Sequence, residues 1–260
     1  MLAVISPAKT LDFASQPPSR KHTAPEFIAE AQALAAIMTT KKPAQLRALM
    51  AISDELAALN HARFQTWSAQ PAPSAQRPAL FAFRGDVYLG LEATTLTARD
   101  LDYAQSHVRI LSGLYGLLRP LDLIQPYRLE MGTRLKNPRG RDLYAFWDAR
   151  PAHALAAQAK ALRTPTLVNL ASQEYFRAVD EDALGLEVVT PMFKDWSRGE
   201  YRTISFFAKR ARGMMLRYMV ERRCRKAAQL LEFTGGGYAY DAASSTPQAP
   251  VFIRRQPQDA

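Results

Sequence analysis

The order of hydrophobic and polar positions along the chain predicts a mixture of strands and helices. Short, mainly apolar runs at 2–6, 79–83 and 166–170 are typical of strands buried in a sheet. Apolar residues at helical spacing predict helices at 26–38, 43–64, 98–111, 142–162 and from about 206 onwards. The segment at 43–64 is either one helix or two. Further strands are predicted by composition and alternation: 128–135, 186–194, 200–205, 238–241 and 251–254.

The connecting segments and the order of elements indicate the fold class. Polar, proline-rich stretches at 14–25 and 68–78 are expected to be loops. Pro151 lies within the helix predicted at 142–162, so that helix should kink or restart there. Strands and helices are intermixed without an internal repeat, which predicts an α/β protein, with mixed α+β as the alternative. We expect one compact domain over 1–254, with a mixed sheet surrounded by helices, and a C-terminal tail over 255–260.

Composition narrows the class of protein. The chain has 260 residues, of which 48% are hydrophobic, enough for a sizeable core. Its single cysteine, Cys224, excludes a disulfide within the chain and favours a reducing compartment. The apolar run at the start is too short for a signal peptide, and no run is long enough for a membrane span. We therefore expect a cytoplasmic protein without a membrane partner.

Positive charge is concentrated near the C-terminus. Residues 194–226 hold eleven lysines and arginines and three acids, which accounts for +8 of the chain's formal net charge of +10. On a helical wheel the apolar residues after 206 share one face, while Lys209, Arg210, Arg212 and Arg217 share the other with Gly213. A glycine on that face would let a phosphate approach the backbone closely. The pattern favours a polyanionic partner such as DNA, and the alternative is a solvated charged face.

Two short segments outside the basic helix are also candidates for binding an anion. Lys9 follows directly after the first predicted strand, where α/β proteins often bind ligands, although a surface lysine is the alternative. Gly113 and Gly116 bracket a tight connection after a predicted helix, a pattern in which backbone N–H groups can bind a DNA phosphate. Pro120 limits the length of any helix that follows, and an ordinary helix-terminating turn is the alternative.

Three segments place an arginine two or three residues from an acid: Arg84 with Asp86, Arg119 with Asp122, and Arg128 with Glu130. Such pairs either fix loops as ion pairs or form a pocket in which arginine holds phosphate beside a carboxylate. The chain contains no phosphate-binding loop of the Walker type, no dinucleotide-binding glycine motif, no serine-hydrolase elbow and no zinc-type spacing of cysteine and histidine. We therefore expect neither a cofactor nor a metal, and the pattern identifies no catalytic residue.

Seven motifs together resemble one family. They are SPAKTL at 6–11, GDVY at 85–88, LSGLYG at 111–116, LRPLD at 118–122, PYRLEMG at 126–132, NLAS at 169–172 and AKRARG at 208–213. In this order they closely resemble the peroxide stress resistance protein YaaA family of bacteria, over Met1 to about Arg254. The combination is highly specific.

The resemblance implies a biological role and a site. It implies a fold particular to the family, with a positively charged cleft and a helix-hairpin-helix element, which binds duplex and irregular DNA without reading its sequence. It also implies that the protein helps bacteria to survive hydrogen peroxide and that it affects free intracellular iron. The histidines are scattered along the chain and form no dedicated iron site, so we expect the effect on iron to be indirect. We place the hairpin at Gly113–Gly116, and the helical pair within 43–64 is the competing position.

These observations predict two sets of site residues. DNA phosphates are expected to be bound by Lys9, Arg84, Gly113, Tyr115, Gly116, Arg119, Arg128, Lys194, Lys209, Arg210, Arg212 and Gly213. A polar pocket is expected to include Ser6, Asp86, Asp122, Glu130, Asn169 and Ser172. The favoured hypothesis is a monomeric DNA-binding protein without catalysis. The alternative is an enzyme that acts on a nucleic-acid lesion or a nucleotide-like phosphorylated small molecule in the same cleft, which requires the polar residues to converge on one pocket.

Overall fold

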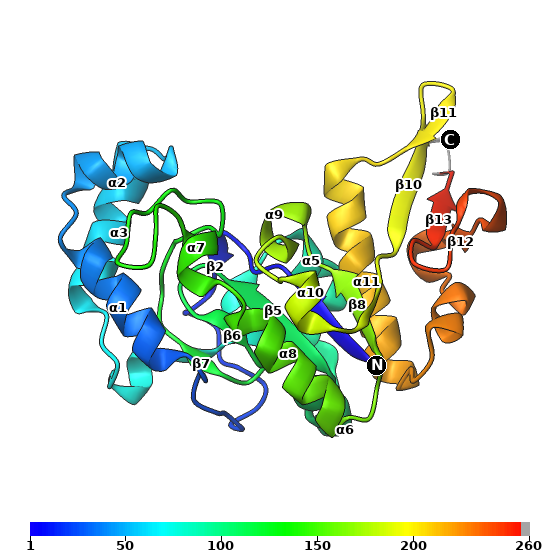
Figure 1. Cartoon of the computed structure of the whole chain (residues 1–260), viewed down its shortest axis with the longest axis horizontal. Coiled ribbons are helices and arrows are strands. Elements are labelled where there is room, and N and C mark those ends of the chain that lie inside the picture. Colours follow the sequence, from blue (N-terminus) through cyan, green and yellow to red (C-terminus); the bar gives the residue numbers. More distant parts are fainter. Residues whose placement is uncertain (256–260) are drawn as a thin grey trace.

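A five-stranded sheet forms the centre of the computed structural model, which describes residues 1–255 (Figure 1). In spatial order its strands are β6 (Gly116–Leu118), β5 (Val108–Ser112), β1 (Leu2–Ile5), β8 (Thr166–Leu170) and β9 (Glu187–Val189). Neighbouring strands from β5 to β9 are parallel, and β6 pairs with β5 in antiparallel fashion. The fold is therefore a mixed α/β arrangement, as the order of elements predicts.

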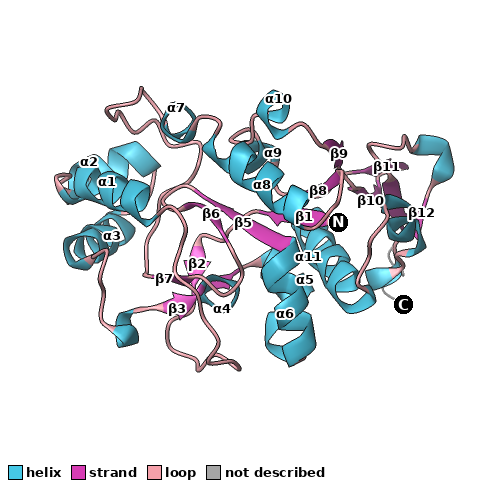
Figure 2. Cartoon of the chain, turned by 60° about the horizontal axis from the view of Figure 1, so that its bottom comes forward, coloured by secondary structure: helices cyan, strands magenta, loops and turns pink. Residues whose placement is uncertain are grey.

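Helices cover both faces of this sheet, so that β1 is buried throughout (Figure 2). Leu2 and Val4 pack in one apolar cluster with Leu155 of α8 (Arg150–Ala161). The alternate residues of β1 belong to the second cluster, on the opposite face, which contains residues of α5 (Asp86–Leu91), α6 (Ala98–His107) and α11 (Ser205–Arg222). A strand covered on both sides is expected to be apolar at every position, which explains the uninterrupted run near the N-terminus.

Two further groups of elements lie at opposite ends of the molecule (Figure 1). At one end are α1 (Ile28–Thr39), α2 (Pro43–Met50) and α3 (Asp54–Thr66). At the other end is a four-stranded sheet in the order β11 (Glu200–Arg202), β10 (Met192–Ser197), β13 (Val251–Arg254) and β12 (Ala239–Tyr240). The segment at 43–64 thus forms two helices. The strands predicted at 200–205, 238–241 and 251–254 are found within a few residues, whereas the single strand predicted at 186–194 is divided between β9 of the central sheet and β10 of the second sheet.

Short elements complete the chain. The helices are α4 (Ala79–Ala82), α7 (Leu143–Trp147), α9 (Gln173–Phe176) and α10 (Glu181–Leu184). Short 3-10 helices lie at Pro73–Ala75, Ala93–Thr95, Ala227–Glu232, Gly235–Gly237 and Ala242–Ser244. Two small antiparallel pairs join β2 (Thr10–Leu11) to β4 (Phe83–Arg84) and β3 (Arg77–Pro78) to β7 (Leu123–Ile124). No helix within residues 1–255 has the length and apolar character that a bilayer crossing requires.

Three other expected elements also differ in the structure. The apolar run at 79–83 is largely the short helix α4, because the antiparallel pairs on either side of it turn the chain. The segment at 128–135 is irregular rather than a strand. The helix predicted to reach residue 111 ends at His107, where the chain enters β5. The expected break at Pro151 is confirmed, since α7 ends and α8 begins just before it.

Candidate functional site

A cavity of about 450 Å³ lies beyond the carboxyl ends of β1 and β8. Its walls come from five separate parts of the chain: 6–10, 84–88, Glu130, 172–175 and the first turns of α11. The chain passes from β1 to β5 on one side and later to β8 on the other, so the strand order reverses beside β1. In open α/β sheets ligands bind outside the carboxyl ends of the strands at such a reversal.

Hydrogen bonds between the two strand ends position the floor of the cavity. The Ser172 backbone amide donates to Ser6 Oγ at 2.8 Å, and the two hydroxyl oxygens lie 3.3 Å apart. The Tyr88 hydroxyl donates to the Ser6 carbonyl at 3.1 Å, which attaches α5 to the same loop. Ser172 also accepts from the Tyr175 amide and begins the short helix α9. These bonds hold polar loops from three distant segments in one place.

One cationic group of the cavity is balanced by an acid. Lys9 Nζ lies 2.8 Å from Glu130 Oε2, and Arg128 Nη2 donates to Glu130 Oε1 at 3.0 Å. The buried Nε of Arg128 has no hydrogen-bond partner among the residues described. Arg84 lies 3.7 Å from Asp12, which is a weak contact for an ion pair. Glu130 is therefore shared by two cations.

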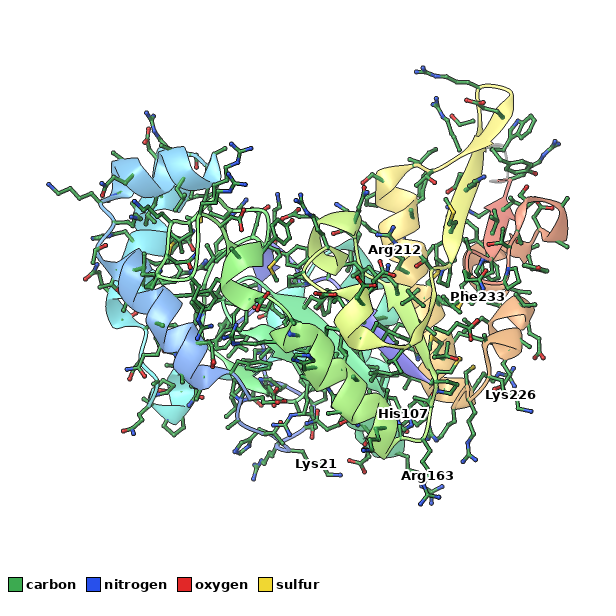
Figure 3. All side chains as sticks on the ribbon, in the orientation of Figure 1. Lys21, His107, Arg163, Arg212, Lys226 and Phe233 are labelled. Atoms are coloured by element: carbon green, nitrogen blue, oxygen red, sulfur yellow. The ribbon has the colours of Figure 1, made fainter. Side chains whose placement is uncertain are left out.

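The opposite wall, from α11, carries cations that the described chain does not balance. Within residues 1–255, neither Lys209 nor Arg212 forms an ion pair. Lys209 is exposed, whereas Arg212 is half-buried, and burial lowers the pKa of its guanidinium below the ordinary value. A cation that loses water without gaining an acid is stabilised by a bound anion. Figure 3 shows Arg212 on the side of α11 that faces α9 and α10.

Two tyrosines supply hydroxyl groups at the cavity. Burial raises the pKa of both Tyr88 and Tyr175 well above the ordinary value, so both remain protonated at neutral pH. Asp86, Glu130 and Glu174 contribute carboxylates to the same lining. The cavity thus combines cations for an anionic group with carboxylates and hydroxyls that can hold a polar ligand or transfer a proton.

The cavity adjoins other hollows along α11. A hollow of about 550 Å³, lined by Asn169 and Thr190, shares Arg212 with it. On the other side a hollow of about 670 Å³ shares Arg84 and Tyr88 with the cavity and extends to Arg210. Three hollows therefore adjoin one another beside α11, with Arg212 between the first two and Arg84 between the cavity and the third.

The sequence is similar to that of known proteins over nearly its whole length. The family model for the peroxide stress protein YaaA matches residues 1–244. The chain belongs to the YaaA family. A UPF0246 protein of Paraburkholderia xenovorans is 54% identical over 257 residues, which cover 98% of this chain and 99% of the relative. A UPF0246 protein of Pseudoalteromonas translucida is 52% identical over 255 residues, with 98% of each chain covered.

The structure of this YaaA-family chain brings many of the predicted residues together. Eight of them line the cavity: Ser6, Lys9, Arg84, Asp86, Glu130, Ser172, Lys209 and Arg212. Arg128 lines a small neighbouring hollow that shares Lys9 and Glu130 with the cavity. Asn169 and Arg210 line the adjoining hollows described above. Of the six residues predicted for the polar pocket, Ser6, Asp86, Glu130 and Ser172 line the cavity, whereas Asn169 lines an adjoining hollow and Asp122 lies elsewhere, so the convergence that an enzyme requires is partial.

Other predicted residues lie elsewhere. Asp122 is almost completely buried, where it accepts hydrogen bonds from Thr23 at 2.6 Å and from the Arg119 backbone at 2.7 Å. Arg119 forms an ion pair with it at 3.0 Å and donates to the Ala24 carbonyl at 2.7 Å. This pair holds loops together and contributes to none of the hollows described. Lys194 lies on β10 of the second sheet, away from the cavity lining.

The placement of a phosphate-binding hairpin at Gly113–Gly116 is wrong. These residues connect β5 to β6 in a β-hairpin rather than two helices, and all four are buried. A side chain at Gly113 would lie 2.2 Å from the Leu129 carbonyl oxygen, so the chain packs directly against it. The Tyr115 hydroxyl accepts hydrogen bonds from Trp67 Nε1 and the Gln125 amide. The glycines therefore serve packing in the core and cannot reach a phosphate.

The interpretation of Gly213 as a site of phosphate approach is also wrong. Gly213 is buried against α5, where an added Cβ would lie 1.8 Å from the Val87 carbonyl oxygen. Gly90 of α5 is equally close to α11, with a Cβ position 2.1 Å from the Arg210 carbonyl oxygen. The two glycines let the helix backbones touch. A helical wheel of one helix cannot reveal that a second helix crosses it at that point.

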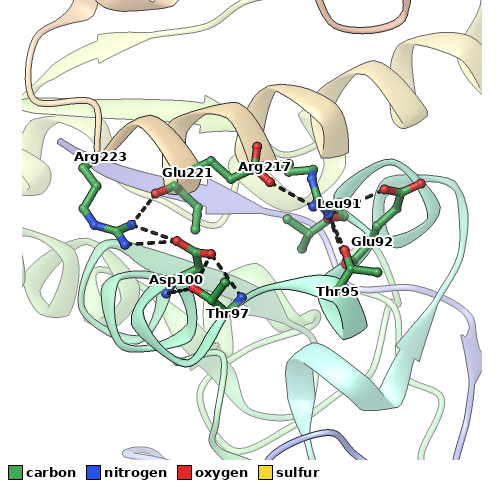
Figure 4. A network of polar contacts seen from close by, with 9 residues as sticks. Leu91, Glu92, Thr95, Thr97, Asp100, Arg217, Glu221 and Arg223 are labelled. Carbon is green, nitrogen blue, oxygen red and sulfur yellow. Dashed lines mark hydrogen bonds and ion pairs between the residues drawn. The ribbon is translucent and has the colours of Figure 1, made fainter.

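Arg217 belongs to a structural network rather than to a free cationic surface (Figure 4). It donates to the Leu91 carbonyl at 3.1 Å and to Thr95 Oγ1 at 2.7 Å, and it forms an ion pair with Glu221 at 2.8 Å. These contacts attach the middle of α11 to the end of α5. The cations available to an anion are therefore fewer than the charge of the basic segment suggests.

Tyr88, Glu174 and Tyr175 are among the contributors to the cavity that were not predicted. Tyr88 lies in the GDVY motif, and Glu174 and Tyr175 closely follow the NLAS motif. The motifs therefore marked these positions, although tyrosine and glutamate by themselves did not indicate a site. Three of the four histidines have backbone partners: Nδ1 of His22, His61 and His107 lies within 3.0 Å of the carbonyl of Arg20, Lys41 and Tyr103 respectively. Across residues 1–255, histidine, cysteine and acidic side chains form no group of three suited to a metal.

Proposed function

We propose that this protein binds DNA during the bacterial response to hydrogen peroxide, and that it holds phosphate groups at the cavity beside α11 without reading base sequence. Membership of the peroxide stress protein YaaA family supports the biological role. The observation that carries the binding proposal is Arg212, a half-buried cation that no acid of the described chain balances. Phosphate is the anion that a polyanionic partner would supply.

The arrangement of cations supports a partner longer than one phosphate. Lys209 and Arg212 stand on one wall of the cavity, Arg84 stands on another, and Arg210 continues into the next hollow. Contacts of this kind position a nucleic acid through its backbone and carry no sequence information. We propose that the basic cleft of the family corresponds to this series of hollows.

We propose further that the helix-hairpin-helix element of the family corresponds to α2 and α3. Only residues 51–53 separate the two helices. Ala51 adopts a left-handed backbone conformation, and the Ser53 side chain accepts a hydrogen bond from the Leu56 amide at the start of α3. This is the competing position that the sequence suggested, and it provides the helical pair that Gly113–Gly116 lacks.

We propose that the effect on free intracellular iron is an indirect consequence of DNA binding. DNA covered by protein at phosphate groups presents fewer anionic positions at which iron ions collect. Damage by hydrogen peroxide at those positions would then decrease. Metal analysis of the purified protein tests the indirect route, since stoichiometric iron would contradict it.

The DNA-binding proposal is tested by titrating labelled duplex DNA at increasing salt concentration. Each phosphate contact releases counterions, so the logarithm of affinity should fall linearly with the logarithm of salt, with a slope of about −0.9 per contact. Duplexes of unrelated sequence should give the same affinity. Absence of binding at low salt would overturn the proposal.

The lining of the cavity supports a second candidate, an enzyme that acts on a nucleic-acid lesion or on a nucleotide-like phosphorylated small molecule. Asp86, Glu130 and Glu174 lie at the cavity together with two protonated tyrosines. Carboxylates repel DNA phosphates, so a surface that only binds DNA gains nothing from them. A volume of about 450 Å³ falls in the range of small-molecule sites, and it could hold one nucleotide unit.

This candidate is tested by incubating the protein with lesion-containing oligonucleotides and with nucleotides, followed by mass spectrometry of the products. Turnover that is lost in Asp86→Asn and Glu130→Gln, while DNA affinity is retained, would support the enzyme. Unchanged substrates in every incubation would contradict the enzyme and leave DNA binding as the remaining candidate.

A further inference from the structure

The hairpin formed by β10 and β11 carries an aromatic pair outside the core. It projects beyond the body of the molecule at one end of the second sheet (Figure 1). Trp196 lies directly opposite Tyr201, with ring centroids 5.0 Å apart. Trp196 is 40% exposed, whereas Trp147 is fully buried. Large aromatic side chains that remain exposed are typical of binding surfaces.

The register of the sheet determines which face Trp196 occupies. Along β10, Phe193 and Asp195 point into the interior, and the alternate residues point outward. Asp195 is fully buried, with Arg254 Nη2 at 2.6 Å and the Tyr238 hydroxyl donating at 2.7 Å. A slip of one residue would expose this carboxylate group and bury Trp196. The exposure of Trp196 is therefore built into the sheet.

Positive charge surrounds the exposed ring. The guanidinium carbon of Arg255 lies 4.3 Å from the centroid of the Trp196 ring. Arg198 is exposed at the turn of the hairpin, and Arg202 donates to Ser197 Oγ at 3.2 Å. Of the two acids in the hairpin, Asp195 is neutralised by Arg254, which leaves Glu200. The surface is thus complementary to a polyanion that also offers flat apolar groups.

We propose that Trp196 stacks against unpaired bases of single-stranded DNA, and that Arg198 and Arg255 hold the adjoining phosphates. Aromatic side chains bind single strands by stacking with any base, while cations follow the backbone. The guanidinium plane of Arg255 adds a second stacking surface. Bases within a duplex are already stacked and cannot reach the ring, so this surface selects unpaired segments.

This inference rests on the proposed function and adds a structural preference to it. The hairpin continues through Thr203 and Ile204 into α11, whose first turns carry Lys209 and Arg212 at the cavity. A strand held by its phosphates at the cavity could therefore place unpaired bases against the hairpin. The two parts would then act on one DNA molecule.

The test compares Trp196→Ala, Trp196→Phe and the control Met192→Ala in the full-length protein. Met192 shares the outward face of β10 and the same 40% exposure, but it offers no ring. With a labelled oligothymidine, Trp196→Ala should bind about tenfold more weakly, and Trp196→Phe should retain most of the affinity. Met192→Ala should match the wild type, and a labelled duplex should bind all four proteins alike.

Oligothymidine affinity that is unchanged in Trp196→Ala would overturn this inference. The proposed function would survive that result if Lys209→Ala combined with Arg212→Ala still weakened DNA binding. A wild-type protein that binds neither probe would overturn both. Quenching of tryptophan fluorescence by oligothymidine in the wild type, absent in Trp196→Phe, would be independent support, and its persistence in Trp196→Phe would contradict the stacking.

Discussion

Ser6 and Ser172 lie 166 positions apart in the sequence, yet the backbone amide of Ser172 donates to the Ser6 hydroxyl at 2.8 Å. The contact joins the loops that follow β1 and β8, which are parallel neighbours in the sheet. The loop from Ser6 leads to Lys9, and the loop from Ser172 leads to Tyr175 at the same cavity. The relationship therefore connects the topology of the sheet to the shape of the candidate site.

Ser6→Ala should destabilise the protein and weaken DNA binding. The substitution leaves the Ser172 amide without its acceptor, a loss that costs about 1–3 kcal/mol for a buried group and at the lower end here, where the site is partly buried. Urea unfolding measures the stability, and the same sample gives the affinity for duplex DNA. Ser106→Ala is the matched control, because it removes a half-buried hydroxyl whose hydrogen bond, to the Asp102 carbonyl, stays within α6. Equal stability and affinity in Ser6→Ala and the wild type would contradict the role of this contact.

Gly213→Ala should destabilise the protein, although glycine to alanine within a helix ordinarily stabilises by about 1 kcal/mol. The added methyl group would lie 1.8 Å from the Val87 carbonyl oxygen and 2.8 Å from the Leu91 amide nitrogen. Both contacts are with backbone, so α5 and α11 must separate, at a cost of about 1–3 kcal/mol or more. Arg210→Ala on the exposed side of the same helix should change the free energy of unfolding by less than about 0.5 kcal/mol. A stabilised Gly213→Ala protein would show that the helices do not touch there.

His107 should make the protein less stable as pH falls from about 7 to about 5. Burial lowers the pKa of its imidazole below the ordinary 6.5, and the nearby positive charges of the N-terminus and Arg109 add to this effect. As the pH falls, the unfolded chain takes up a proton near pH 6.5 while the folded chain does not. The free energy of unfolding therefore becomes smaller as the pH falls through that range. His107→Phe can keep the stacking on Tyr103, whose ring centroid lies 3.9 Å away, and should reduce this dependence. Urea unfolding at several pH values measures it, and an unchanged slope in His107→Phe would refute the assignment.

Sequence patterns predicted the elements that are buried either on both faces or on one face only. The apolar runs of β1 and β8 and the two-faced helix α11 are recognisable because a sheet covered on both sides and a half-buried helix impose distinct spacings. The polar residues after those strands were also predictable, since the ends of parallel strands share one edge of a sheet. This is why Ser6, Lys9 and Ser172 were expected at the site and are found there.

The errors arose where a distant partner decides the structure. The apolar residues at 108–112 continue the preceding helix without a breaker, yet pairing with β1 makes them a strand. That pairing turns the motif around Gly113 into a β-hairpin in the core. Gly213 likewise fits an open helix face until Gly90 of a second helix is placed against it. Spacing along one segment contains no information about which other segment will cover it.

The central claim is that cations of the cavity, rather than the charge of the basic segment as a whole, bind DNA phosphates. The most direct test is a gel-shift titration that compares Lys209→Ala/Arg212→Ala with Arg225→Ala/Lys226→Ala. Both pairs remove two positive charges from the basic segment, but Arg225 and Lys226 are exposed residues outside the cavity, and Lys226 lies far from Arg212 (Figure 3). We predict that Lys209→Ala/Arg212→Ala weakens binding to all DNA sequences alike, about tenfold or more. The slope of the logarithm of affinity against the logarithm of salt should be shallower in this variant, by the equivalent of up to two phosphate contacts. The other pair should bind nearly as the wild type does. Equal affinity for the two double variants would contradict the claim.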